Sequence, residues 1–289
     1  MASTSKTALV LHGGAGLIAD RPYAQEIAHL RSLAEEGRER LKAGESALDV
    51  VVDLVRAMEA SGLYVAGKGT APNRAGRYEL DAAVMNGATR EAGAVSALEG
   101  FVSPVLAARA VMERTPHVLL SGGGAADFAR EAGLEEVTDP AGYYTPAAIA
   151  DDRPIATGTV GCVALDSQGR LAAATSTGGT LRKRWGRVGD TPIIGHGTWA
   201  DRNVAVSCTG QGEMFMRACA AADVAARVRY AGSGLDAAVQ GALDDVKAVG
   251  GDGGIIAVGK GGEISARYNS AGMKHAIVHP DGAITADIR

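Results

Sequence analysis

Three short polar segments in the second half of the chain carry residue types that can bind and cleave an acyl compound. They are TSTGG at residues 175–179, GRVGD at 186–190 and TGQGE at 209–213. Each stands at the end of an expected strand or in a turn, where hydroxyls, charged groups and backbone N–H groups can face a ligand. The segments therefore predict a site for a small polar molecule.

Arg187 and Asp190 are opposite charges three residues apart. A guanidinium can hold a carboxylate through two parallel hydrogen bonds, and a carboxylate can accept from an ammonium group. The pair thus suits the two charges of an amino-acid backbone, although it equally suits an ordinary surface ion pair. Thr209 and Gly210 offer a hydroxyl and a backbone N–H for an oxyanion hole, or simply a turn from strand to helix.

The dipeptide Gly158-Thr159 stands directly before VGCVAL at 160–165, an apolar run that predicts a buried strand. Glycine allows unusual dihedral angles and a close approach of other groups to the backbone, whereas threonine at the start of a strand is common. Taken alone, the pair is an ordinary strand start.

Other kinds of site find little support in the sequence. The glycine-rich stretches at 12–16, 121–124 and 250–254 lack the spacing of a phosphate loop. No two of the six histidines have metal-ligand spacing on one element. The cysteines, Cys162, Cys208 and Cys219, lie in apolar or helical stretches, and we interpret them as reduced, buried thiols.

The composition bounds the class of protein. The chain has 289 residues, 46% of them hydrophobic and 21% charged, with a net charge of −4. That balance is typical of a globular protein and gives no support for nucleic-acid binding. No apolar run approaches the roughly 20 residues of a membrane span, and the N-terminus lacks a secretory apolar region. We therefore expect a cytoplasmic protein with no nucleic-acid or membrane partner.

The elements that must position the polar segments alternate between strands and helices. Apolar runs predict strands at 7–11, 78–85, 93–98, 117–120, 160–166, 171–175, 204–208, 255–258 and 264–268. Helical stripes predict helices around residues 27–41 and 50–58, from Ser103-Pro104 onward, and at 214–230 and 235–249. Ser46 is an expected N-cap and Gly62 an expected helix end. We expect two stacked sheets covered by helices on both outer faces, a four-layer α/β sandwich.

In their order and spacing, GTVGCVALD, TSTGG, GRVGD and SCTGQGE resemble the plant-type L-asparaginase/isoaspartyl peptidase family of N-terminal nucleophile (Ntn) hydrolases. The resemblance runs from LVLHGGAG at 9–16 to NSAGM at 269–273, almost the whole chain. It implies the αββα sandwich of the Ntn-hydrolase fold in a single domain. It also implies no cofactor apart from a structural sodium ion, and a homodimer of processed protomers.

The family's members cut themselves before a threonine, which here implies cleavage between Gly158 and Thr159. The products would be an alpha subunit, 1–158, with its linker at about 135–158, and a beta subunit, 159–289. Thr159 would then supply both the nucleophilic hydroxyl and, through its free α-amino group, the base. By matching position, Thr177 orients the nucleophile, Arg187 binds the substrate α-carboxylate and Asp190 binds its α-ammonium group.

The remaining matched positions surround the substrate acyl group: Thr209 and Gly210 as the oxyanion hole, and Gly212 as a wall of the aspartyl pocket. The implied activity is release of L-aspartate from β-aspartyl dipeptides, with weaker L-asparaginase activity. The sequence does not rank the leaving groups, and the dipeptides β-Asp-Arg and β-Asp-Lys are candidates among them.

The chain departs from the family pattern in two places. The family's usual Asn is replaced by Val65, in a segment from Leu63 to Thr70 that resembles a sodium-binding loop. Lys68 places a cation in that loop, which argues against sodium there. In addition, the run RKRW at 182–185 before GRVGD is unusually basic.

Two alternatives remain at this point. A glycosylasparaginase shares the superfamily, although such enzymes typically have a signal peptide and disulfides. A non-catalytic amino-acid-binding protein could use the same glycine turns. Denaturing electrophoresis separates the latter from a self-cleaving hydrolase, because only the hydrolase gives two fragments.

Overall fold

The computed structural model describes residues 6–18, 20–147 and 158–289. Its larger sheet has eight strands in the order β12-β11-β1-β5-β6-β2-β3-β4. These strands are β1 (Ala8–Ala15), β2 (Leu80–Asn86), β3 (Ala92–Leu98), β4 (Leu119–Ser121), β5 (Val160–Leu165), β6 (Leu171–Thr177), β11 (Met273–Val278) and β12 (Ile284–Asp287). Neighbouring strands are antiparallel except for β3 and β4, which are parallel.

The smaller sheet has four antiparallel strands in the order β10-β9-β8-β7. They are β7 (Thr198–Ala200), β8 (Val204–Gly210), β9 (Gly253–Gly259) and β10 (Ile264–Tyr268). The two sheets lie face to face, with β1, β5 and β6 of the large sheet against β8 and β9 of the small one. Apolar side chains from both sheets fill the space between them.

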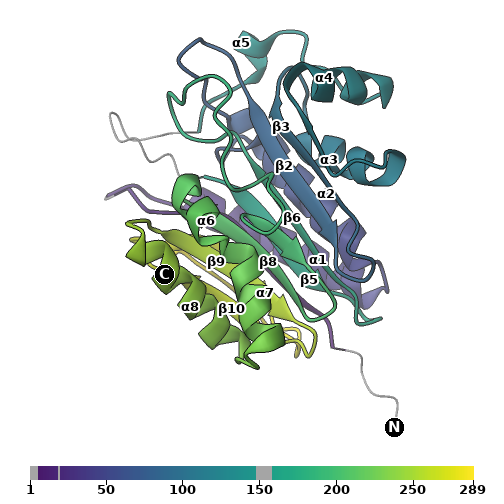
Figure 1. The fold of residues 1–289 in the computed structure, drawn as a ribbon, viewed down its shortest axis with the longest axis vertical. Coiled ribbons are helices and arrows are strands. Elements are labelled where there is room, and N and C mark those ends of the chain that lie inside the picture. The colour runs from purple at the N-terminus through teal and green to yellow at the C-terminus, as the bar shows by residue number, and fades with distance from the viewer. Residues whose placement is uncertain (1–5, 19, 148–157) are drawn as a thin grey trace.

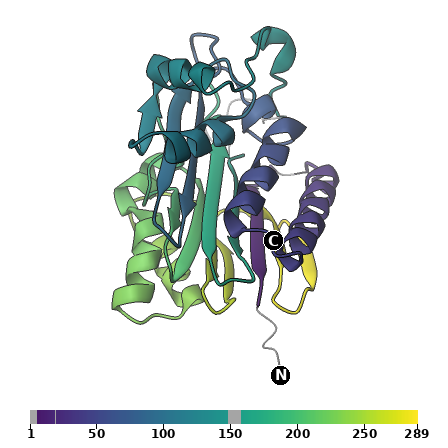
Figure 2. The same ribbon diagram turned by 90° about the vertical axis from the view of Figure 1, so that its right-hand side faces the viewer.

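Helices cover both outer faces (Figure 1). The large sheet carries α1 (Ala24–Lys42), α2 (Ala47–Ser61), α3 (Pro104–Arg114) and α4 (Gly122–Glu131), and the small sheet carries α6 (Gly212–Ala218), α7 (Ala220–Tyr230) and α8 (Leu235–Ala248). Two short helical turns complete the set: η1 (Gly67–Gly69) and α5 (Pro140–Tyr143). The side view in Figure 2 separates α1 and α2 from the helices of the small sheet. The expected four-layer sandwich is confirmed.

The register of the strands brings the polar segments to one end of the sandwich. Val160, the first residue of β5, pairs with Ser176 near the end of β6. The strand β8 lies opposite β5 and β6 and ends at Gly210. Because β5 begins where β6 and β8 end, Thr159, Thr177 and Thr209 all lie at the same edge.

The helix ends that were predicted from capping residues agree with the structure. The Ser46 hydroxyl accepts a hydrogen bond from the backbone N–H of Asp49 at 3.1 Å, so it caps α2 as expected. Gly62 ends the same helix with φ of +72°, a left-handed conformation that favours glycine. The helix predicted from Ser103-Pro104 begins at Pro104.

Several boundaries differ from the predictions. The strand expected at 7–11 continues through HGGA to Ala15, because β5 pairs with it as far as His12 and β11 as far as Ala15. The glycines 122–124, which follow the expected strand at 117–120, begin α4. The helix expected at 214–230 is two helices, broken at Cys219, whose φ is +49°. Cys219 is exposed, contrary to the expectation of a buried thiol, whereas Cys162 and Cys208 are buried.

The predicted linker is partly structured. Within it, α5 forms at 140–143, and the Thr145 and Ala147 N–H groups donate to the carbonyls of Lys68 and Gly69 at 2.9 and 3.0 Å. Residues 148–157 of the predicted linker lie outside the described residues. Among the helices that the structure describes, none combines the length and apolar character needed to cross a membrane.

Candidate active site

The Thr159 hydroxyl stands at the start of β5 and donates a hydrogen bond to the Thr177 hydroxyl at 3.0 Å. The Thr177 hydroxyl in turn accepts from the backbone N–H of Gly179 at 3.0 Å and donates to the carbonyl of Val65 at 3.5 Å. Thr177 therefore fixes the direction of the Thr159 hydroxyl. The two threonines that the sequence predicted as nucleophile and orienting residue are in direct contact.

Gly158 lies in a position that a larger residue cannot occupy. A Cβ there would lie 2.5 Å from Val65 Cγ2 and 2.6 Å from Val65 N. The backbone of Val65 also contributes, because its carbonyl accepts from the N–H of Gly178 at 2.8 Å. Position 65 thus acts on this site through its backbone and through the packing of its side chain on Gly158.

A buried hydrogen-bond chain supports Thr159 from behind. His12 Nδ1 lies 3.1 Å from the Thr159 carbonyl oxygen, and His12 Nε2 lies 2.9 Å from Ser207 Oγ. Burial lowers the pKa of His12 to about 3, so the ring is neutral. A carbonyl can only accept, so Nδ1 carries the proton and Nε2 accepts from Ser207. The chain continues through Thr175 to Thr198, at 2.7 and 2.8 Å.

His12 was missed as a functional residue at the level of the sequence, where it was considered only as part of a glycine-rich turn. A useful signal was available: the histidine directly follows the apolar run ALVL, and β1 buries it completely. A buried neutral histidine requires partners for both ring nitrogens. That requirement predicts a polar contact in the interior.

Arg187 has two usable edges, and Glu213 occupies one of them. Its Nε and Nη2 atoms donate to the two carboxylate oxygens of Glu213, each at 2.9 Å. A guanidinium has five N–H donors, so three remain, and two of these, one each from Nη1 and Nη2, form an edge that is open to a second carboxylate. The bond from Arg187 holds the pKa of Glu213 below its usual value. Glu213 was not predicted as a site residue from the sequence.

Three glycines leave space along the second edge of Arg187. A Cβ at Gly212 would lie 2.9 Å from Nη2, one at Gly189 would lie 2.8 Å from Nη1, and one at Gly179 would lie 3.4 Å from Nη1. Gly179 also bonds to Thr177, so it joins the edge of Arg187 to the nucleophile.

Asp190 is buried on the other side of Gly212. A Cβ at Gly212 would lie 2.8 Å from Asp190 Oδ1, so this glycine separates the two charged groups predicted to hold the substrate. Asp190 Oδ2 is a buried carboxylate oxygen without a hydrogen-bond partner among the described residues. Burial raises the pKa of Asp190 to about 7, against the nearby charge of Arg187. An ammonium group would satisfy this oxygen and favour the charged form.

Thr209 and Gly210 end β8 at the same edge of the sandwich. The Thr209 hydroxyl accepts a hydrogen bond from the N–H of Ala15 at 3.3 Å, which ties it to the end of β1. Gly210 has φ of +147°, and a Cβ there would lie 2.6 Å from Gly253 Cα, so only glycine fits. In the described part of the chain no hydrogen bond joins Thr209 to Thr159.

The loop at 63–70 contains backbone carbonyls and the buried Thr70 hydroxyl, which has no hydrogen-bond partner among the described residues. The carbonyl oxygens of Gly62 and Tyr64 pack against Gly69, where a Cβ would lie 3.0 and 2.0 Å from them. Such oxygens suit a hard cation such as sodium. The aliphatic part of Lys68 lies near Gly62. In the residues that the structure describes, no three His, Cys, Asp or Glu side chains gather as a metal site.

The basic run at 182–185 divides into a buried and an exposed part. Lys183 is buried and donates to the Glu79 carbonyl at 2.9 Å, with the Glu79 carboxylate 3.8 Å away. Burial lowers the pKa of Lys183, while the carboxylate of Asp81 opposes that shift. Lys183 therefore anchors the loop that leads to Arg187. Arg184 and Trp185 are exposed.

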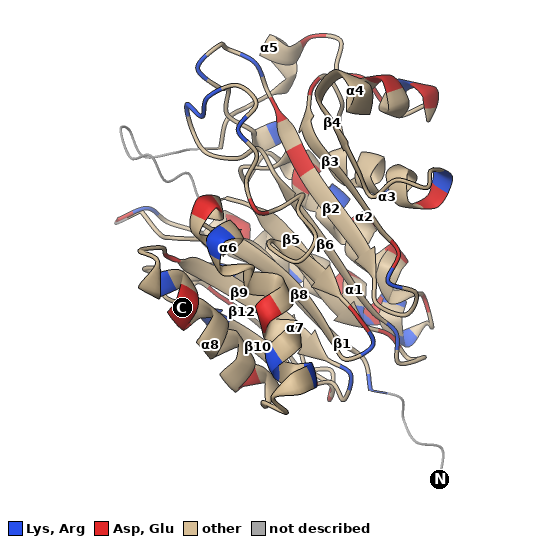
Figure 3. Ribbon diagram, viewed as in Figure 1, with Lys and Arg blue, Asp and Glu red and all other residues tan. Residues whose placement is uncertain are grey.

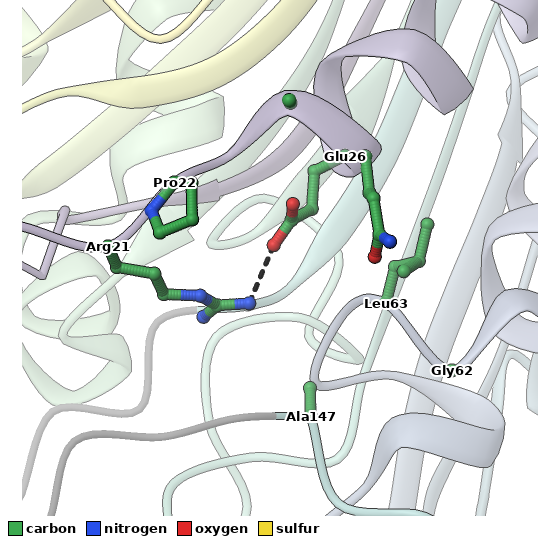
Figure 4. A pocket seen from close by; sticks show the side chains of 8 residues that line it. Arg21, Pro22, Glu26, Gly62, Leu63 and Ala147 are labelled. Carbon is green, nitrogen blue, oxygen red and sulfur yellow. Dashed lines mark hydrogen bonds and ion pairs between the residues drawn. The ribbon is translucent and has the colours of Figure 1, made fainter.

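A separate cavity of about 510 Å³ lies beside the start of α1, lined in part by Leu63 and Ala147 (Figure 4). The Arg21–Glu26 ion pair, at 2.6 Å, crosses its wall. Of the predicted site residues, Leu63, at the start of the predicted sodium loop, lines this cavity, whereas the predicted catalytic and substrate-binding residues do not. Ala147 packs with Val65 and Leu181, so the cavity wall touches the residue whose carbonyl contacts Thr177.

Comparisons with known proteins agree with this arrangement. The family model described as asparaginase matches residues 5–151 and 141–286. The isoaspartyl peptidase of Salmonella typhimurium (strain LT2) is 44% identical over 298 residues, which cover 94% of this chain and 95% of the relative. The isoaspartyl peptidase of Escherichia coli (strain K12) is 43% identical over 296 residues, covering 94% and 92%. The isoaspartyl peptidase/L-asparaginase of Xenopus laevis is 38% identical over 288 residues, covering 96% and 93%. The chain is therefore a hydrolase of the plant-type L-asparaginase/isoaspartyl peptidase family, which has the Ntn-hydrolase fold.

Proposed function

We propose that this hydrolase cuts itself at Gly158–Thr159 and then releases L-aspartate from β-aspartyl dipeptides, with weaker activity on L-asparagine. The observation that carries the proposal is the Thr159–Thr177 hydroxyl pair, joined through Gly179 to the open edge of Arg187. The printed names of the relatives, isoaspartyl peptidase and isoaspartyl peptidase/L-asparaginase, support the choice of substrate.

Self-cleavage would convert the Gly158–Thr159 amide into a new N-terminus. Thr159 Oγ bonds to the carbonyl carbon of Gly158 while the C–N bond breaks and the nitrogen takes up a proton. The resulting ester is hydrolysed by water, which leaves a carboxylate on Gly158 and both a hydroxyl and an amino group on Thr159. The α-amino group, with an ordinary pKa of about 7.7–8.0, can then accept the proton of the hydroxyl during turnover.

In turnover, Arg187 would hold the substrate α-carboxylate on its Nη1–Nη2 edge, and Asp190 would accept from the α-ammonium group. The β-carbonyl carbon then receives Thr159 Oγ, and the amine leaves with a proton. Water hydrolyses the aspartyl ester to L-aspartate. The Thr209 hydroxyl and the Gly210 N–H would stabilise the negative oxygen in both steps.

The leaving group distinguishes the candidate substrates. L-asparagine releases ammonia, which makes few contacts, whereas a dipeptide's leaving amino acid can make contacts that form in the transition state. We expect β-Asp-Leu to exceed L-asparagine in kcat/KM by at least about tenfold, which corresponds to roughly 1.4 kcal/mol. Aspartate release from both compounds under identical conditions measures this difference. A higher kcat/KM for L-asparagine would contradict the peptidase assignment.

The rim of the site carries exposed positive charge. Arg184 is exposed on the loop before Arg187, and the exposed Arg74 donates to the carbonyl of Arg182 at 3.0 Å. Figure 3 shows several basic segments among the loops at this end of the molecule. Since like charges repel, the rim disfavours a positively charged leaving group, although salt screens the effect.

We therefore expect β-Asp-Arg and β-Asp-Lys to be poorer substrates than β-Asp-Leu. At about 6 Å in water, one pair of like charges costs roughly 0.7 kcal/mol, so two arginines give a three- to tenfold lower kcat/KM at low salt. The replacement Arg184→Gln should reduce the difference in kcat/KM between the basic dipeptides and β-Asp-Leu. Arg31→Gln, at an exposed position on α1, should leave this difference unchanged. Equal kcat/KM values for the basic and apolar dipeptides at low salt would disprove the effect of the rim.

Two groups must lose a proton for activity, so protonation of either group at low pH lowers kcat/KM. Asp190, with its pKa of about 7, is charged above that pH and loses its hold on the ammonium group as the pH falls. The Thr159 α-amino group must also be neutral to act as a base. We expect kcat/KM for β-Asp-Leu to fall toward a hundredfold per pH unit well below pH 7. In the enzyme–substrate complex the bound ammonium keeps Asp190 charged, so kcat should fall only tenfold per unit. A kcat/KM slope of tenfold per unit would exclude Asp190 from this role.

Sodium, assembly and compartment complete the proposal. The backbone carbonyls of the loop at 63–70 and the unpartnered Thr70 hydroxyl would hold sodium, which would order the loop that presents the Val65 carbonyl to Thr177. The resemblance supports a cytoplasmic homodimer of processed protomers.

A glycosylasparaginase is the alternative, and release of aspartate from a glycosylated asparagine but not from β-Asp-Leu would favour it. Membership of a hydrolase family argues against a non-catalytic binding protein.

A further inference from the structure

The end of the sandwich opposite Thr159 carries a second cluster of charged residues. The β2–β3 turn and the β7–β8 turn meet there beside the last turn of α7. These segments line a cavity of about 200 Å³. Since β6 and β8 each have seven residues, this cavity lies roughly 20 Å along the strands from the nucleophile. Its ligand would therefore be separate from the substrate.

Three arginines from these three segments line the cavity: Arg90, Arg202 and Arg229. One carboxylate, that of Asp201, lies among them, with its Oδ2 atom 3.6 Å from Arg229 Nη1. Asp201 Oδ1 is engaged elsewhere, because it accepts from the backbone N–H groups of two residues in its own turn. Within the described residues neither Arg90 nor Arg202 has a carboxylate at ion-pair distance. The cavity wall thus has a net positive charge.

Each guanidinium is held by a contact that leaves N–H donors open. The Arg90 guanidinium carbon lies 4.7 Å from the ring centroid of Trp199, a cation–π contact. Arg202 Nε donates to the Ala88 carbonyl at 3.4 Å. Arg229 faces Asp201 through a single nitrogen. Forked, pre-positioned guanidinium groups are well suited to bind an oxyanion.

The backbone conformation of Arg90 is a second indication that this arginine binds a ligand. Arg90 has φ of +66° in the turn between β2 and β3, a left-handed conformation that costs a residue with a side chain about 1–2 kcal/mol. Gly or Asn would suit the turn better. An arginine in this conformation therefore serves something other than the turn, and it lies in the wall of the cavity.

We propose that this cavity binds a small oxyanion of the phosphate or sulfate class. A volume of about 200 Å³ suits such an ion and falls below that of a pocket for a larger organic ligand. The bound anion would join Arg90, at an edge of the large sheet's β2–β3 hairpin, to Arg202, in the small sheet. It would therefore stabilise the folded protein by linking the two sheets.

Thermal unfolding of the purified protein tests the proposal. Inorganic phosphate at constant ionic strength should raise Tm saturably, by about 3 °C at ten times its Kd, while added chloride should not. The variant Arg90→Gln/Arg202→Gln should lose at least tenfold in phosphate affinity. Arg31→Gln is the matched control, because this arginine is exposed on α1 far along the chain from the cavity. An unchanged phosphate response in the double variant would overturn the proposal.

Two further variants test whether phosphate binds at Arg187 instead and whether the double variant is simply less stable. Phosphate could also bind Arg187, so the variant Arg187→Lys should keep the saturable rise in Tm. If the double variant melts at a lower temperature in chloride alone, the phosphate response is measured in the single variant Arg202→Gln, because among the described residues the Arg202 side chain makes one hydrogen bond, to the Ala88 carbonyl. The same thermal unfolding measurement is made with sulfate and with succinate, and sulfate should also raise Tm. A rise in Tm with succinate alone would show that the cavity binds a carboxylate and would overturn the proposed phosphate or sulfate class.

Discussion

Replacing Thr159 by alanine is expected to leave one full-length chain of 289 residues and to abolish hydrolysis. The substitution removes the only atom of residue 159 that can attack the Gly158 carbonyl, and the same atom would later attack the substrate. Both reactions are therefore expected to fail together. We expect kcat/KM for β-Asp-Leu to fall by at least about 10⁴-fold, as for the loss of a nucleophile in other hydrolases.

The fold of the variant should survive. Thr159 lies outside β5 and is only partly buried, and its side chain makes one hydrogen bond, to Thr177. The bond from His12 goes to the backbone carbonyl of residue 159, which alanine retains. Circular dichroism and thermal unfolding of the uncut chain should therefore match those of the wild-type precursor. This comparison separates a chemical effect from misfolding.

Denaturing electrophoresis and aspartate release measure the two outcomes. The matched control is Thr159→Ser, which keeps the hydroxyl and should still yield two fragments, more slowly because serine lacks the methyl group that restricts χ1. Gly158→Ala is a useful companion, because its Cβ would lie 2.5 Å from Val65 Cγ2 and should impair cutting. Two fragments from Thr159→Ala, with cleavage at the same bond, would refute the proposed nucleophile.

The layered fold could be predicted from the sequence because its inner elements carry strong local signals. The strands β5 and β9 are continuous apolar runs, buried along their whole length. The edge strands β7 and β12 escaped prediction for the opposite reason, whereas the edge strand β10 was predicted with its observed bounds. In β12 the residues alternate between half-buried and exposed, so ITAD lacks the apolar contrast that marks a strand. The break at Cys219 also has no local signal, since the helical stripe continues through it.

The candidate site was predictable where single residue types are required. The glycines around the second edge of Arg187 are needed because a Cβ would contact its nitrogens, and GRVGD and TGQGE contain two of them. His12 and Glu213 were missed because their roles depend on partners 147 and 26 residues away in the chain. A sequence pattern does not contain those distances. Only the folded chain brings such partners together.

The variant Arg187→Lys is expected to lower kcat/KM for β-Asp-Leu by about a hundredfold while self-cleavage continues. In the structure Arg187 donates from Nε and Nη2 to Glu213 and keeps its Nη1–Nη2 edge open. A lysine ammonium has three donors on one atom and cannot form two planar forks at once. It would therefore either leave Glu213 or bind the substrate carboxylate through one contact. A loss of about 2.7 kcal/mol in transition-state binding gives the hundredfold effect.

The result distinguishes substrate binding from support of the fold. Self-cleavage uses the chain's own Gly158 carbonyl, with no free α-carboxylate to bind, so cutting should proceed at a rate near that of the wild type. The control is Glu213→Gln. It removes the negative charge beside the Nε–Nη2 edge of Arg187 but leaves the substrate-binding Nη1–Nη2 edge in place, so its kcat/KM should fall less than that of Arg187→Lys. The measurements are the rate of appearance of the two fragments and the kinetics of the processed variants on β-Asp-Leu. Because Arg187 would contact the same aspartyl group in every substrate, the loss should be similar for L-asparagine. A variant that fails to cut but, once cut, turns over normally would assign Arg187 to the fold instead of the substrate.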